Sequence, residues 1–219
     1  MTTTLSGPMV PPKSGTARQA VVLLHGYGAD GQDLLGLAPA LQPAMPDALF
    51  VAPNAPQQCD QLSAGYQWFP ISFEGDRLSR RQKGVLEARP VLEGFLEALW
   101  AQTGLNASQT VLIGFSQGAM MALHVGMALD KPPRAIIGFS GAFLPPAGFG
   151  EARTDYPPVC LVHGDSDSVV DPALSAEAKD ALEAAGVAVH YHVSPGAGHG
   201  IAPDGLESAL DFLSGLQPA

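Results

Sequence analysis

Short apolar segments alternate with helix-patterned segments along most of the chain, and this alternation limits the possible folds more than any other feature. The apolar runs are short and continuous, which is typical of strands buried on both faces of a sheet. We predict strands at residues 20–24, 48–52, 110–115, 135–139, 159–162 and 187–193. We predict helices at residues 33–41, 76–103, 118–128, 172–185 and 203–216. The sequence therefore predicts an α/β fold, with a mostly parallel central sheet and helices on both faces.

Some segments depart from this simple alternation. Residues 54–74 are rich in Pro, Gln and aromatic residues without a clear period, so we predict a long loop there. Pro90 lies inside the helical pattern and either kinks the helix or starts a second one. We expect an irregular N-terminal segment at residues 1–17 and a single domain over residues 1–219. Residues 141–158 leave room for only a short loop, so no large lid domain is expected.

Charge and hydropathy exclude several classes of function. The net charge is −10, from 11 basic and 21 acidic residues, which argues against binding to nucleic acid or to anionic lipid. No apolar run reaches the ~18 residues of a membrane helix, and we find no secretory leader, so we expect a cytoplasmic protein with no integral membrane association. Cys59 and Cys160 form no CxxC pair. They indicate neither a zinc site nor a disulfide scaffold. A single disulfide between the two cysteines is the alternative that the sequence leaves open.

A hydroxyl group follows the predicted strand at residues 110–115. Ser116 lies in Gly114-Phe115-Ser116-Gln117-Gly118, which matches the G-x-S-x-G pattern of a nucleophile elbow. The pattern needs glycine on both sides because the serine sits on a sharp turn between a strand and a helix, where side chains would collide. Ser140 also follows a strand, but Ala142 stands where the elbow needs glycine. We interpret Ser140 as a structural turn residue near the site.

An imidazole and a carboxylate follow two later strands. His199 lies in a glycine-rich loop before the last helix, which favours it as the general base. We interpret the other histidines as structural, namely His25, His124, His163, His190 and His192. Asp165, Asp167 and Asp171 compete for the role of the acid. Asp171 fits a helix cap and Asp165 fits a turn, and spacing alone favours Asp167 only weakly.

The loop after the first predicted strand, His25-Gly26-Tyr27-Gly28, is the expected second half of an oxyanion hole. Such a hole needs two backbone N–H groups directed at the tetrahedral intermediate. The residue after the nucleophile, Gln117, provides one of them. Tyr27 is the candidate for the other.

Four motifs occur together in this chain: Leu24-His25-Gly26-Tyr27-Gly28-Ala29-Asp30-Gly31, Gly114-Phe115-Ser116-Gln117-Gly118, His163-Gly164-Asp165-Ser166-Asp167-Ser168-Val169-Val170 and Gly198-His199-Gly200. Together they resemble the phospholipase/carboxylesterase family, which includes bacterial carboxylesterases and acyl-protein thioesterases. The resemblance implies an α/β-hydrolase fold and a triad of Ser116, Asp167 and His199. It implies oxyanion-hole amides at Tyr27 and Gln117, and it is the sole basis for expecting a homodimer.

The loop at residues 53–75 departs from the family's pattern. Family members often carry a Trp–aromatic–Asp stretch there, whereas this chain has Trp68-Phe69-Pro70. We expect an open cleft whose apolar border favours acyl groups over charged substrates. The residues expected at this border are Trp68, Phe69, Ile71, Phe73, Phe143 and Leu144.

These features predict a serine hydrolase that cleaves carboxylic esters, and by extension thioesters, through an acyl-enzyme. The chemistry needs no metal ion and no organic cofactor. The expected partner is a small-molecule acyl ester or thioester. The alternatives are a non-catalytic binding protein with the same fold, or an acyl-protein thioesterase or lysophospholipase with a narrow substrate range.

Overall fold

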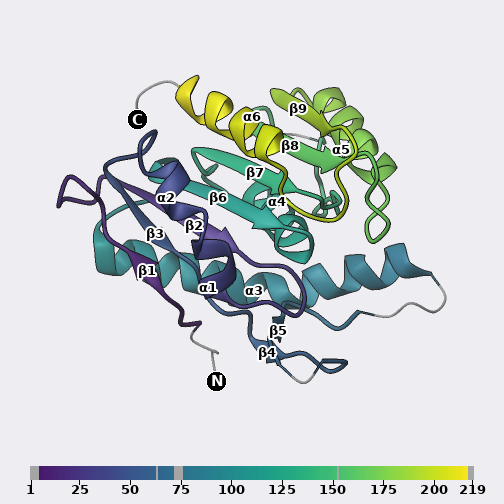
Figure 1. Ribbon diagram of the computed structural model, residues 1–219, viewed down its shortest axis with the longest axis horizontal. Coiled ribbons are helices and arrows are strands. Elements are labelled where there is room, and N and C mark those ends of the chain that lie inside the picture. Colours follow the sequence, from purple (N-terminus) through teal and green to yellow (C-terminus); the bar gives the residue numbers. More distant parts are fainter. Residues whose placement is uncertain (1–4, 63, 72–75, 152, 217–219) are drawn as a thin grey trace.

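A seven-stranded sheet forms the centre of the protein (Figure 1). This computed structural model describes residues 5–62, 64–71, 76–151 and 153–216. The strand order is β1-β3-β2-β6-β7-β8-β9, and neighbouring strands are parallel except for β1 and β3. The strands are β1 Met9–Val10, β2 Gln19–Leu24, β3 Ala48–Val51, β6 Thr110–Phe115, β7 Ala135–Phe139, β8 Val159–Gly164 and β9 Val189–Ser194. The prediction of a mostly parallel sheet is confirmed.

Helices cover both faces of this sheet (Figure 1). One face packs against α3 Arg77–Thr103, α4 Gln117–Ala128 and α5 Ala173–Ala184, and the other against α1 Gly31–Leu35, α2 Ala38–Leu41 and α6 Pro203–Ser214. Along β6, Leu112 belongs to the first core, whereas Val111 and Ile113 belong to the second. Because successive side chains of a strand point to opposite faces, strands buried on both faces must be apolar throughout.

The longest helix, α3, runs through the proline in its sequence. Asp76 caps its start, where its side chain accepts hydrogen bonds from the amides of Leu78 and Ser79, each at 3.1 Å. Pro90 lies inside the continuous helix, so the expectation of a second helix starting there is wrong. Gly104 ends the helix in the left-handed region at φ 73°, where glycine carries no steric penalty.

Short elements account for the differences from the sequence-based prediction. Residues 1–17 are not wholly irregular, because β1 pairs with β3 and forms the edge of the sheet. The predicted long loop contains a small hairpin of β4 Gln57–Gln58 and β5 Tyr66–Gln67. The helix predicted at residues 33–41 is split into α1 and α2. Pairings of two residues carry no hydrophobic period, so the sequence pattern does not reveal them.

The connection between β7 and β8 is a loop, so the described residues contain no large lid. A short 3₁₀ turn, Ala107–Gln109, leads from α3 into β6. No described helix combines the length and the apolar character that crossing a membrane requires.

Candidate active site

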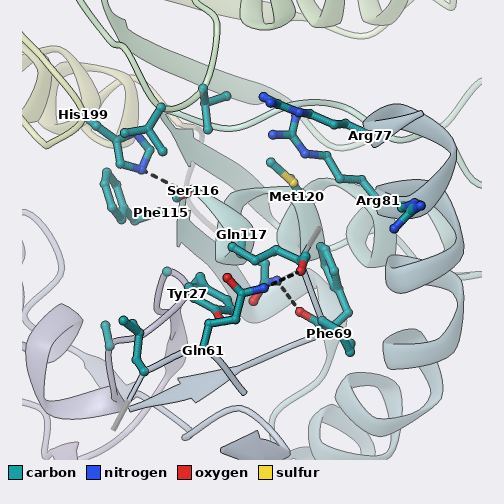
Figure 2. A pocket seen from close by; sticks show the side chains of 18 of the residues that line it. Tyr27, Gln61, Phe69, Arg77, Arg81, Phe115, Ser116, Gln117, Met120 and His199 are labelled. Atoms are coloured by element: carbon teal, nitrogen blue, oxygen red, sulfur yellow. Dashed lines mark hydrogen bonds between the residues drawn. The ribbon is translucent and has the colours of Figure 1, made fainter. Parts of the chain in front are cut away.

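The carboxyl ends of parallel strands bring three predicted side chains together at one edge of the sheet. Ser116 follows β6, Asp167 lies in the loop after β8, and His199 lies in the loop after β9. The His199 Nε2 atom is 3.1 Å from the Ser116 Oγ atom, and His199 Nδ1 is 2.7 Å from Asp167 Oδ2 (Figure 2 shows the first contact). The three groups thus form a continuous hydrogen-bond chain, the arrangement of a nucleophile, its base and an orienting acid.

The backbone at Ser116 is held in a strained turn. Its φ of 53° lies in the left-handed region, which is unfavourable for a residue with a side chain. A Cβ atom at Gly114 would lie 2.2 Å from the Gly118 carbonyl oxygen, and one at Gly118 would lie 1.9 Å from the Leu24 oxygen. Glycine is therefore required at both positions. Helix α4 begins at Gln117, so its positive end faces the site.

The hydrogen bonds of His199 show which of its two ring nitrogens carries the proton. A carboxylate only accepts hydrogen bonds, so the proton on His199 Nδ1 is donated to Asp167. In the neutral ring, Nε2 is then free to accept the proton of the Ser116 hydroxyl. The ring also packs against Phe115, with 4.9 Å between the ring centroids. The imidazole is therefore oriented on both sides.

Asp167 is the carboxylate that contacts His199, whereas the two competing acids make other contacts. Asp165 accepts a hydrogen bond from the Gly196 amide at 2.7 Å and so holds the loop that carries the base. Asp171 accepts one from the Ala173 amide at 2.9 Å, in the turn that leads into α5. The structure therefore separates three residues that spacing alone left open.

The pKa of Asp167 is lowered despite the burial of the carboxyl group. Burial alone would raise it, but the hydrogen bonds from His199 and from the amides of Val170 and Val169 outweigh that effect. The two amides donate to Oδ1 at 2.9 and 2.8 Å. The carboxylate thus stays ionised where its charge can stabilise an imidazolium.

A second imidazole contacts the same carboxylate. His163 is fully buried, and its Nε2 lies 3.1 Å from Asp167 Oδ2 and 3.0 Å from the Val170 carbonyl oxygen. Both partners only accept hydrogen bonds, so Nε2 carries a proton. On its other side, Nδ1 lies 2.5 Å from the Ser175 hydroxyl oxygen. The sequence analysis identified His163 as structural but missed this contact, because a four-residue spacing brings side chains together only on a helix and His163 lies in β8.

His25 holds the loop after β2 and is neutral. Its Nε2 accepts a hydrogen bond from the Ala55 amide at 3.0 Å, so the ring proton is on Nδ1, 2.7 Å from the Gly26 carbonyl oxygen. Burial lowers the pKa of this ring, which favours the neutral form. The remaining histidines contact groups outside the triad: His124 the Leu144 carbonyl, His190 the Ser208 hydroxyl and His192 the Asp204 carboxylate.

Tyr27, in the loop after β2, and Gln117, the first residue of α4, line the same cavity as Ser116. Within the described part of the chain, neither backbone amide donates to another protein group. The Gln117 side chain ties its helix to the loop after β5. Its Oε1 accepts from the Trp68 amide at 2.8 Å, and its Nε2 donates to the Phe69 carbonyl at 2.7 Å (Figure 2 shows the second contact). Two donors with no protein acceptor suit a developing oxyanion.

A cavity of about 430 Å³ opens at Ser116 and His199. Phe69 and Ile71, two of the predicted border residues, line it together with Pro70, which occupies the position of the family's acid. The expectation for Trp68 is wrong, because its indole is 1% exposed and donates to the His25 carbonyl at 3.0 Å instead of lining the cavity. Phe73 lies outside the described residues.

The expectation for Phe143 and Leu144 is also wrong. Both line a different groove, which α3 and α5 border and which does not include Ser116. Two contacts hold the loop at this groove. The Leu144 carbonyl accepts a hydrogen bond from buried His124 at 2.6 Å, and the Phe143 ring packs on Phe149. The loop after β7 therefore runs away from the cavity.

Three arginines line the cavity and were missed by the sequence analysis. Arg77, Arg80 and Arg81 come from the first turns of α3. The expected apolar border is thus only part of the wall. The sequence feature that could have revealed these arginines is a cluster of basic residues at the start of a helix in an acidic chain.

Neither cysteine forms a disulfide. Cys59 and Cys160 are both free thiols, so the alternative of a single bridge is wrong. Burial raises the pKa of Cys160 to about 12, which makes it an unreactive core residue. Among the described residues, no group of three or more His, Cys, Asp or Glu side chains is placed to hold a metal ion.

Comparison with known proteins gives a consistent relationship. The sequence matches the profile of the phospholipase/carboxylesterase family over residues 5–217. It is 32% identical to esterase YpfH of Escherichia coli, over 90% of this chain and 82% of that protein. It is 26% identical to acyl-protein thioesterase 1 of Neurospora crassa, over 96% of this chain and 92% of that protein.

A solved structure is also closely similar. The crystal structure of esterase PE8 superposes with a TM-score of 0.93 and 48% sequence identity, covering 98% of this chain and 100% of that one. The strand order, the absence of a large lid in the described residues and these relatives all indicate the same family. The chain belongs to the phospholipase/carboxylesterase family, has the α/β-hydrolase fold and is a carboxylic ester hydrolase.

Proposed function

We propose that Ser116, His199 and Asp167 are the catalytic triad of this ester hydrolase. The observation that carries the proposal is the hydrogen-bond chain of 3.1 and 2.7 Å that joins the three side chains beside the cavity. Ser116 attacks the ester carbonyl while His199 Nε2 takes the hydroxyl proton. His199 then gives this proton to the leaving alcohol or thiol, and water cleaves the acyl-enzyme by the same route in reverse.

The amides of Tyr27 and Gln117 stabilise the negative charge that develops on the carbonyl oxygen. Each removed donor of this kind typically costs about 10²–10³ in turnover. Asp167 keeps the proton of His199 on Nδ1 and stabilises the imidazolium. This division of roles uses no metal ion and no organic cofactor.

The substrate in this proposal is a small acyl ester. Phe69, Ile71 and Met120 give the cavity apolar surface for an acyl chain. Thioesters are the second candidate class, because acyl-protein thioesterases are among the relatives and the same triad chemistry cleaves both bonds. A non-catalytic binding protein would have no need for a strained, partly exposed serine hydroxyl beside an oriented imidazole.

Labelling with a fluorophosphonate tests the assignment. The reagent forms a stable bond with an activated serine hydroxyl, and peptide mass spectrometry then locates the modification. We expect one equivalent on Ser116 and none after denaturation in urea. An unlabelled native protein, or a label on another serine, would overturn the proposed triad.

Three further expectations belong to the same proposal. The two cores share one sheet, which supports a single domain. The two free thiols fit the reducing cytoplasm. A homodimer rests on the family resemblance alone, and light scattering coupled to size-exclusion chromatography tests it.

A further inference from the structure

Arg77, Arg80 and Arg81 form one side of the active-site cavity, which we call the arginine wall. The chain has 11 basic and 21 acidic residues, so three of its few cations face this single cavity. Figure 2 shows the Arg77 side chain extending from α3 toward the space in front of Ser116, and Arg81 follows on the same helix. Asp33, on α1, is the acidic side chain among the described lining residues. The wall therefore places three guanidinium groups along one side of the cavity of an acidic protein.

Arg81 is the informative member of the wall. Its guanidinium is partly buried, and within the described ranges the structure gives it no hydrogen bond and no carboxylate partner. Arg77 and Arg80 make contacts of their own. Burial and the neighbouring charge of Arg77 lower the pKa of Arg81. Holding a cation in this position costs free energy unless an anion offsets it, so the position suits a ligand that brings a negative charge.

The location of the wall indicates which part of the substrate carries that charge. Ser116 lies between His199 on one side and the two labelled arginines on the other (Figure 2). The leaving group must lie on the His199 side, because this residue donates the proton that the leaving oxygen or sulfur takes up. The acyl group consequently extends along the other side, past Met120 toward the arginine wall.

We propose that the arginine wall binds a carboxylate at the far end of the acyl group, so that preferred substrates are half-esters or half-thioesters of dicarboxylic acids. This inference rests on the triad proposed above. A guanidinium presents paired N–H donors that match the two oxygens of a carboxylate. In the reaction, water adds its hydroxyl to the acyl carbonyl and its proton to the leaving group. The products are a dicarboxylic acid and an alcohol or thiol.

A matched substrate pair tests the charge on the acyl side. The first substrate is the mono-p-nitrophenyl ester of adipic acid, and the second is the same compound with its free carboxyl methylated. Both have the same leaving group and chain, and each enzymatic rate is corrected for the spontaneous rate. We expect kcat/KM to be about tenfold higher for the carboxylate, the size of one charge-assisted contact. We also expect added salt to reduce this ratio.

Two variants of α3 locate the effect. In Arg81→Gln the ratio of the two kcat/KM values should fall about tenfold, toward unity. Lys83→Gln is the matched control: it removes the same charge from the same helix, but Lys83 is exposed, pairs with Glu87 at 3.7 Å and does not line the cavity. We expect Lys83→Gln to keep the wild-type ratio.

A second substrate pair separates the acyl side from the leaving-group side. It compares p-nitrophenyl hexanoate with the hexanoyl ester of 5-hydroxy-2-nitrobenzoate, whose carboxylate is on the leaving group. A preference for this second ester that depends on Arg81 would overturn the placement of the anion. Equal rates on the adipate pair, with the neutral ester still hydrolysed, would overturn the arginine wall alone. No hydrolysis of any ester would overturn the triad and this inference together.

Discussion

Ser116 and Ser140 each follow a parallel strand of the central sheet, and both have a positive φ angle. The φ angles are 53° and 49°, both in the left-handed region. The Ser116 amide donates to the Phe139 carbonyl and the Ser140 amide to the Val162 carbonyl, each at 2.8 Å. In both cases the turn is held by the next strand of the sheet. Both serines share the positive φ angle and the amide contact, so these features alone do not make a nucleophile.

The surroundings of the two serines differ. Helix α4 starts directly after Ser116, and the hydroxyl is partly exposed beside His199. A loop follows Ser140, whose hydroxyl is buried and has no hydrogen-bond partner among the described residues. The comparison teaches that a reactive serine needs the helix end and the facing imidazole in addition to the strained turn.

The largest expected effect comes from removing the two hydroxyls one at a time. Ser116→Ala should lower kcat/KM for p-nitrophenyl butyrate by at least about 10⁴-fold, because the nucleophile is lost. Ser140→Ala should change it by less than about twofold and leave the stability nearly unchanged, since a buried hydroxyl without a partner is removed. Steady-state kinetics and urea unfolding measure both. Comparable losses of activity in the two variants would contradict the distinction between the turns.

A smaller effect concerns the glycines that precede or follow the two serines. Gly118→Ala would place a Cβ atom 1.9 Å from the Leu24 carbonyl oxygen, so we expect a loss of more than about 3 kcal/mol in the free energy of unfolding. Gly138→Ala meets its nearest atom, on Leu123, at 3.4 Å and should cost less than about 1 kcal/mol. Urea unfolding midpoints compare the two variants. A similar cost at both sites would mean that the first turn is not the tighter one.

The smallest effect concerns His25, whose carbonyl oxygen lies 2.6 Å from the place of a Cβ atom on Gly118, in the first turn. Burial lowers the pKa of His25 from its ordinary value of 6.5. The unfolded chain therefore takes up a proton at a higher pH than the folded one. The stabilisation is complete above pH 6.5 and is lost as the pH falls toward the lowered value.

His25→Gln should remove this part of the pH dependence. Each such histidine contributes at most about 1.4 kcal/mol per pH unit to the slope of the free energy of unfolding. Burial also lowers the pKa of His124, which remains in the variant. His124 therefore still contributes a pH dependence of the free energy of unfolding in the same direction. Urea unfolding between pH 8 and pH 5 measures the two slopes. Identical slopes for the wild type and the variant would show that His25 does not titrate differently in the folded state.

Patterns within a few residues predicted much of the fold. Continuous apolar runs marked the buried strands, and apolar residues at helical spacing marked the helix at residues 76–103. The G-x-S-x-G spacing identified the turn at Ser116, because the need for glycine at Gly114 and Gly118 is a local steric matter. The elements that the sequence analysis missed are also local. Strand β1 and the β4–β5 hairpin are too short to show a hydrophobic period.

Contacts between distant segments could not be predicted in the same way. Phe143 and Leu144 follow a strand that ends near the site, yet a hydrogen bond to His124 directs their loop elsewhere. Arg81 lies on a helix whose orientation relative to Ser116 depends on the packing of α3 against the sheet. No residue type or spacing carries that information.

The sequence by itself determined the order of strands and helices, the elbow at Ser116 and the presence of polar groups after the strands. The tertiary structure decided which of these groups meet: Asp167 with His199 and with His163, and the arginine wall with the cavity. The physical reason is the separation along the chain over which each interaction acts. Steric clashes and hydrophobic periodicity act between near neighbours in the chain, whereas a hydrogen bond across 83 residues exists only after the sheet has packed.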